Sequence, residues 1–218
     1  MKHLIIILLV FFSCNAKAKY RPLKLYEMVI KADKIVYGTI SELDSTTLTL
    51  KIEGSLTNDS GTLKIERFED WTCASRWTEY KIGQRVFLFL TSWKGKLIAM
   101  SAGNEGELPI VKNSVFLNGF SVPVPPPPIP LREIEINDEN LGFKLEHYNI
   151  YGDRFFGTKF KLDKFIKDIS FIRKYFDFEY GTDRELTNWK IKCEPAKIEQ
   201  RAKESDLIIC VYLLSQMK

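Results

Sequence analysis

The sequence contains very little histidine, and this scarcity excludes several kinds of catalysis. His3 lies in an N-terminal hydrophobic leader, so His147 is the only imidazole left for a mature chain. A serine, cysteine or threonine nucleophile needs a base within hydrogen-bond reach, normally histidine. A catalytic triad would have to form around His147, in "LEHYNIY", which alternates like a strand and favours a solvent-facing side chain.

Motifs for metals and phosphates are missing as well. The sequence has no HExxH, no CxxC, no GxxxxGK[ST] and no GxGxxG, so we expect neither a metal site nor a cofactor. Glu66, Glu69 and Asp70 could serve a paired-acid hydrolase, but acids at a strand-to-loop junction are more often simply solvated. We therefore expect no enzyme, and an unrecognised hydrolase ranks third among the functional hypotheses.

Charge of one sign is not in excess. The formal net charge is +4, and removing residues 1–18 takes away Lys2 and Lys17 and no acid, which leaves 30 basic and 28 acidic residues. A near balance of this kind gives no electrostatic reason to expect a nucleic-acid partner.

The only long hydrophobic run lies at the N-terminus, from Leu4 to Phe12, after a basic start and before small and polar residues. This pattern predicts a secretory signal over residues 1–18, with a soluble chain starting at Lys19. The alternative is a lipoprotein signal ending before Cys14, which would be acylated. We expect an exported protein of the periplasm or cell surface, contacting a membrane only through that lipid anchor.

Residues 19–121 are expected to form a mainly β domain. A short amphipathic helix is predicted over 21–33. Segments of strand-like pattern then follow closely, with Gly38 marking a bulge and the unbroken apolar run of "QRVFLFL" indicating a strand covered on both faces. These segments are 34–43, 48–56, 62–68, 84–90, 97–102 and about 109–117. The spacing predicts a small Greek-key barrel or sandwich.

The remainder of the chain is expected to form a spacer and a second module. Residues 122–130, "VPVPPPPIP", favour a stiff polyproline spacer over a docking peptide. Residues 131–218 are expected to hold two short strands and two helices. The predicted strands are 132–136 and 143–151, and the predicted helices lie within 157–181 and across 195–216.

Three cysteines follow the leader, an odd number for an oxidising compartment. A helix over 195–216 would separate Cys193 from Cys210 by about 1.5 Å per residue, far beyond the roughly 4.4–6.8 Å Cα separation of a disulfide. This leaves Cys73–Cys193 as the candidate pair and Cys210 as a buried thiol.

Several short motifs together resemble a known family. They are "KADKIVYGTI" (31–40), Cys73, "YKIGQRVFLFL" (80–90) and "GNEGELPI" (103–110). Residues 20–120 thereby resemble the netrin-like domain, the OB-type barrel shared with tissue inhibitors of metalloproteinases, and most closely its small exported bacterial members. The resemblance implies an OB-like Greek-key barrel of five or six strands, with a short N-terminal helix and helices after the barrel.

The resemblance implies the fold and not the inhibition. Inhibitors of this type chelate the target's zinc through an N-terminal cysteine within a Cys-x-Cys pair, and here Cys14 is followed by Ala16 where the second cysteine is needed. A protease inhibitor acting through barrel loops therefore stays the second hypothesis.

The candidate site lies in "DWTCASRWTEY" (70–80). Trp71 and Trp77 could stack on a ligand, with Arg76 between them holding an anionic group. The alternative, which we favour, is that both tryptophans cap the barrel end and Cys73 ties the loop down. The preferred function is an exported, non-enzymatic binding protein whose partner is a protein, peptide or glycan.

Overall fold

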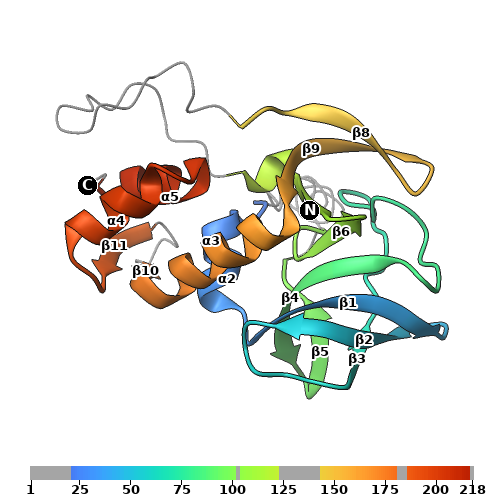
Figure 1. Ribbon diagram of the computed structural model, residues 1–218. Helices are drawn as coiled ribbons and strands as arrows, with labels where there is room; N and C mark the ends of the chain where they lie inside the picture. The colour runs from blue at the N-terminus through green and yellow to red at the C-terminus, as the bar shows by residue number, and fades with distance from the viewer. Residues whose placement is uncertain (1–20, 102–103, 123–142, 181–185, 217–218) are drawn as a thin grey trace, which may run out of the picture.

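Strand β4 separates two hydrophobic cores in the computed structural model, which describes residues 21–101, 104–122, 143–180 and 186–216 (Figure 1). Val86, Leu88 and Leu90 point into a core enclosed by the barrel, and Phe87 and Phe89 point into a second core on the helical side. We call these the barrel core and the helix-side core. The prediction that this strand is covered on both faces is confirmed.

The barrel is a closed sheet of five strands. They follow the order β1-β2-β3-β5-β4, and β4 pairs back onto β1. Every pairing is antiparallel except β3 with β5. The strands are β1 (Lys34–Leu43), β2 (Thr47–Ser55), β3 (Thr62–Glu66), β4 (Arg85–Trp93) and β5 (Lys96–Ala99). The predicted mainly β barrel with helices after it is therefore present.

Gly38 lies at an irregularity in β1, as the sequence predicted. The register between β1 and β2 shifts between Tyr37 and Gly38. A Cβ at Gly38 would lie 2.1 Å from the backbone oxygen of Lys51, so only glycine permits this approach of the two strands.

The sheet continues beyond the barrel. The sequence predicted one strand near 109–117, but the chain reverses at Lys112, whose φ is +54°, and forms β6 (Glu107–Val111) and β7 (Ser114–Asn118). A 3₁₀ turn, η1 (Gly119–Ser121), follows. Strands β8 (Glu146–Ile150) and β9 (Asp153–Lys161) then extend the sheet, because β9 pairs with β7. The sheet has nine strands in all.

The helices gather on one side of the barrel, over the helix-side core (Figure 1). They are α2 (Leu25–Lys31), α3 (Leu162–Tyr175), α4 (Pro195–Ala202) and α5 (Asp206–Gln216). A hairpin of β10 (Phe176–Tyr180) and β11 (Leu186–Ile191) lies beside them. No helix within the described residues is long and apolar enough to cross a bilayer.

Two helix predictions require correction. The predicted helix within 157–181 starts at Leu162 and ends at Tyr175, because Phe176 and Phe178 are both buried with the period of a strand. The predicted single helix 195–216 is broken at 203–205 into α4 and α5. Ser205 stops it, because its hydroxyl accepts from the Ile208 N–H at 3.3 Å and donates to Asp168 at 2.8 Å.

The three cysteines within the described residues are free thiols: Cys73 is exposed, Cys193 is half-buried and Cys210 is buried. The Cys73–Cys193 bond expected from the sequence is therefore not formed in the structure. Cys14, residues 123–130 of the proline-rich segment and the predicted strand 132–136 lie outside the described residues.

Candidate functional site

The loop between β3 and β4, residues 67–84, is fixed to the barrel by Arg76. This residue is only 8% exposed. Its Nε and Nη2 donate to Oε1 of Glu107 on β6 at 2.9 and 2.5 Å, and Nη1 donates to the Thr78 carbonyl at 2.7 Å. A buried guanidinium needs such partners, because leaving it unpaired in a low dielectric is costly.

Two aromatic rings complete this buried cluster. The Arg76 guanidinium lies 3.9 Å from the Trp77 ring centre and 3.8 Å from the Tyr80 ring centre. The Tyr80 hydroxyl donates to Oε2 of Glu107 at 2.7 Å and accepts from the Phe68 N–H at 3.0 Å. Burial, more than any other cause, raises the pKa of Tyr80. The cluster holds the loop in one shape.

The three residues predicted as a binding group are therefore only partly brought together. Arg76 and Trp77 are neighbours, but both are buried, and the Trp77 Nε1–H donates to the Glu107 carbonyl at 3.1 Å. Trp71 stands apart with 43% of its side chain exposed, in a tight turn closed by backbone hydrogen bonds with Ala74 of 2.9 and 3.0 Å. The guanidinium N–H groups of Arg76 donate to Glu107 and Thr78, so a ligand would need a hydrogen-bond donor from another residue.

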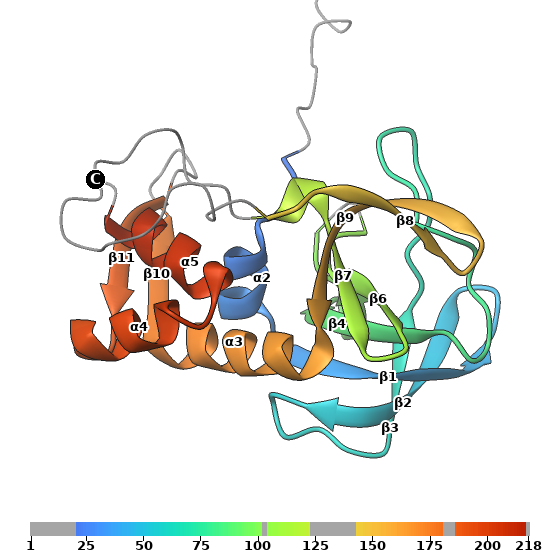
Figure 2. The same ribbon diagram turned by 45° about the horizontal axis from the view of Figure 1, so that its top comes forward.

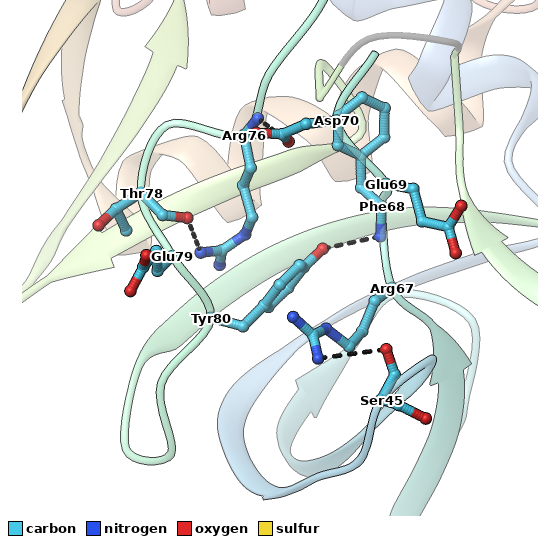
Figure 3. Close-up of a pocket in the computed structure, with 9 residues that line it drawn as sticks. All are labelled: Ser45, Arg67, Phe68, Glu69, Asp70, Arg76, Thr78, Glu79 and Tyr80. Atoms are coloured by element: carbon cyan, nitrogen blue, oxygen red, sulfur yellow. Dashed lines mark hydrogen bonds between the residues drawn. The ribbon is translucent and has the colours of Figure 1, made fainter.

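That donor is Arg67, in a cavity of about 430 Å³ on one side of the loop (Figure 3). Its guanidinium lies 4.8 Å from the Tyr80 ring centre, and Nη1 donates to the Asp44 carbonyl at 2.7 Å. Among the described residues no carboxylate forms an ion pair with Arg67, and its Nε has no hydrogen-bond partner. We call this the Tyr80 cavity; it is lined by Ser45, Arg67, Phe68, Glu69, Asp70, Arg76, Thr78, Glu79 and Tyr80.

The acids around the Tyr80 cavity do not neutralise Arg67. Asp70 accepts from the Arg76 backbone N–H at 2.8 Å, and Figure 3 shows the carboxylates of Glu69 and Glu79 turned away from the Arg67 guanidinium. Sequence reasoning missed Arg67 because it lies at the end of the predicted strand 62–68, on the face of Leu63 and Ile65, and was counted only as part of the alternating strand pattern. No local motif distinguishes it.

A second hollow, the Cys73 groove, lies on the other side of the same loop. Its volume is about 460 Å³, and Arg76 contributes to both hollows. Most of its other lining residues come from the loop, from η1 and from β9, and they include exposed Cys73, Phe120, Arg154 and Phe156. The others are Pro22, Asn104, Glu105 and Asn118. The groove therefore combines apolar rings with one exposed cation.

His147 lies on β8, exposed, with its ring centre 5.0 Å from that of Phe156. This is the solvent-facing strand position that the alternation predicted. Within the described part of the chain no three histidine, cysteine, aspartate or glutamate side chains are grouped as a metal site requires.

A scan against protein-family models found no match to this sequence, and searches of curated proteins and of solved structures found none either.

Proposed function

We propose that this chain is an exported, non-enzymatic binding protein whose β3–β4 loop holds a peptide, protein or glycan partner in the Tyr80 cavity. The observation that carries the proposal is Arg67, a half-buried guanidinium with no carboxylate partner among the described residues, beside an aromatic ring in a preformed cavity. Preformed concave sites with a few convergent polar groups are the usual form of a binding site.

The strand order supports an OB-type barrel as the scaffold. The spatial order β4-β1-β2-β3, with a long connection from β3 to β4, is the order expected of a Greek key, and this supports the proposal. OB-type barrels bind ligands on the face of strands 2 and 3 and on the flanking loops. Ser45, in the turn between β1 and β2, lines the Tyr80 cavity, and this contribution from a flanking loop supports the proposal.

The cavity suits a polar group with hydrogen-bond acceptors. Arg67 offers N–H donors in a planar fork, which match a carboxylate, carbonyl or hydroxyl oxygen. Tyr80 and Phe68 offer ring surface beside it. A peptide backbone or a sugar unit has both kinds of group.

The proposal can be tested by NMR on the ¹⁵N-labelled chain beginning at Lys19, titrated with peptide and oligosaccharide libraries. We expect a binder to shift amide signals of residues 67–80, and Arg67→Gln to weaken it about tenfold, as for loss of a charged hydrogen bond. The matched control is Lys167→Gln, an exposed cation on helix α3.

Several outcomes would contradict the proposal or favour its alternative. Binders that shift only signals elsewhere, or that Arg67→Gln leaves unaffected, would remove the Tyr80 cavity as the site. Turnover of a library member would remove the non-enzymatic assignment. Inhibition of a metalloprotease panel by the same chain would favour the loop-inhibitor alternative.

A further inference from the structure

Three large apolar side chains stand exposed together near the point where the described chain begins. Phe120 is 65% exposed, Phe156 is 41% exposed and Leu145 is 40% exposed. They meet around Gly119, where an added Cβ would lie 2.7 Å from the Phe156 ring and 3.6 Å from Leu145. We call these three residues the Phe120 patch. Exposed apolar groups gathered in this way mark an interaction surface.

The charge around the patch is positive. Lys24 donates from Nζ to the Phe120 carbonyl at 2.9 Å, and exposed Arg154 lines the Cys73 groove together with Phe120 and Phe156. Neither Lys24 nor Arg154 forms an ion pair within the described residues.

The acids nearby have other partners or are buried. Glu27, whose charge acts on Lys24, is 1% exposed and forms an ion pair with Arg21. Glu146 is paired with Lys144 at 2.5 Å. Glu105 lines the groove but is only 4% exposed. The surface offered to a partner is therefore apolar at its centre and cationic at its edge.

We propose that the Phe120 patch is a membrane-facing surface that binds anionic phospholipid. Phe120 and Phe156 enter the interface between headgroups, and Arg154 and Lys24 meet the lipid phosphates. Apolar side chains surrounded by cations are the chemistry of interfacial membrane binding, where each basic residue near the surface adds attraction to anionic lipid.

The position of the chain start favours a bilayer over a protein partner. Figure 2 shows the beginning of the described chain, before α2, beside η1 and the β8–β9 hairpin, and Pro22 lines the Cys73 groove. Lys19 and Arg21 lie just before Pro22 in the sequence, and Arg21 forms an ion pair with Glu27. In the lipoprotein alternative, Cys14 precedes Pro22 by only eight residues. An acyl chain on Cys14 would add to this patch the second signal that stable anchoring needs.

This inference does not depend on the Tyr80 cavity, because the two surfaces use different side chains. It is tested by co-sedimentation of the chain beginning at Lys19 with vesicles of phosphatidylcholine alone and of phosphatidylcholine with phosphatidylglycerol at about 3:1. We expect binding to the anionic vesicles, little binding to the neutral ones, and loss of binding at about 0.5 M NaCl because salt screens the charges.

Matched variants locate the surface. Arg154→Gln should reduce vesicle affinity about fivefold, the effect of one basic residue near an anionic surface. Phe120→Ser should also reduce it, and its fold is expected to persist because the side chain is largely exposed. The controls are Lys51→Gln and Trp93→Ser, the latter an aromatic 55% exposed in the β4–β5 hairpin, at the end of the barrel away from β8 (Figure 1).

Several results would overturn the inference. Equal binding to neutral and anionic vesicles, or no binding to either, would exclude an anionic lipid surface. Controls that lose as much affinity as the patch variants would exclude this location. A dimer in sedimentation velocity that Phe120→Ser dissociates, without vesicle binding by the native chain, would show that a second copy covers the patch.

Discussion

At the scale of single residues, Arg76 was a candidate ligand contact, but its side chain instead holds the β3–β4 loop against the barrel. The Arg76 side chain is 3% exposed, and its guanidinium lies between the rings of Trp77 and Tyr80. The side chain of its partner, Glu107, is 2% exposed. A buried ion pair adds little net stability compared with apolar residues of similar size, because both charges lose their hydration. Removing one partner is costly, because the other charge is then buried without a partner.

The first prediction concerns this pair. Arg76→Ala leaves the Glu107 carboxylate buried without its cation, so we expect the free energy of unfolding in urea to fall by about 3–5 kcal/mol. Arg85→Ala, which breaks the more exposed pair with Glu53, should cost much less. Similar losses for both variants would show that the Arg76 pair is solvated in solution.

The second prediction concerns the thiols. Burial raises the pKa of Cys210 to about 12 and, to a lesser degree, raises that of Cys193. Because the thiolate is the reactive form, iodoacetamide at pH 8 should label exposed Cys73 first and Cys210 only after unfolding. Peptide mapping by mass spectrometry measures the order. Failure of Cys73 to react in the exported protein, with reactivity restored by reductant, would show that it is disulfide-bonded there.

At the scale of elements, the close contact of β1 with β2 depends on Gly38. Gly38→Ala places a methyl group 2.1 Å from the Lys51 oxygen, and the strands must separate to admit it. We expect a loss of about 1–3 kcal/mol in unfolding free energy, as for an overpacked site. Gly61→Ala is the comparison, because an added Cβ there meets nothing within 4 Å and only the positive φ of 78° is strained. A Gly38 variant as stable as the native chain would contradict this register.

The junction of α3 with α4 and α5 carries a pH dependence. Asp168 is 1% exposed and accepts hydrogen bonds from Arg201 at 2.6 Å and Ser205 at 2.8 Å. Desolvation is the largest effect and raises its pKa above 3.8, against the opposing influence of Ser205, Arg201 and Lys164.

Because the pKa of Asp168 is raised on folding, the folded chain binds a proton at the Asp168 carboxylate more tightly than the unfolded chain does. The contribution of Asp168 to stability is full at low pH and declines as the pH rises from 3.8 through the raised pKa. We expect the stability advantage of the native chain over Asp168→Asn, measured by urea unfolding, to shrink across that window. An advantage that grows with pH would mean that the ion pair with Arg201 outweighs desolvation.

Local patterns in the sequence were sufficient to predict the barrel strands from their alternation, the bulge from Gly38, and the two covered faces of β4 from an unbroken apolar run. They were insufficient where one residue overrides a periodic pattern. Ser205 ends a continuous apolar helix pattern by a hydrogen bond to Asp168, 37 residues away in sequence. Phe176 satisfies both the helix and the strand pattern, so the end of α3 was undetermined.

The candidate site was predictable only as a stretch of sequence. The aromatic and cationic residues of the β3–β4 loop are visible in the sequence. Whether the Arg76 guanidinium is available to a ligand or buried in an ion pair depends on Glu107, which lies 31 residues further along the chain. The same long-range contact pairs the Arg76 guanidinium with a carboxylate, while Arg67 has no carboxylate partner among the described residues, although both side chains line the Tyr80 cavity. Local spacing carries no information on that choice.

At the scale of the whole molecule, the barrel and the helices share the wall formed by β4, and strands from both sides of residues 123–142 lie in one sheet. The β3–β4 loop is attached to this sheet by the contact of Arg76 with Glu107. Residues of the loop line both the Tyr80 cavity and the Cys73 groove. A loop fixed in this way loses little entropy when a partner binds, which favours recognition.

The rigidity of that loop is the claim on which the account depends, and native-state hydrogen exchange followed by NMR tests it most directly. The amides of Phe68, Trp71, Ala74 and Arg76 all donate hydrogen bonds within the loop. We predict that they are protected with free energies of opening close to those of the β4 amides, and that Glu107→Gln lowers them selectively. Exchange of these four amides at the rate of an unstructured peptide, while β4 stays protected, would contradict the account.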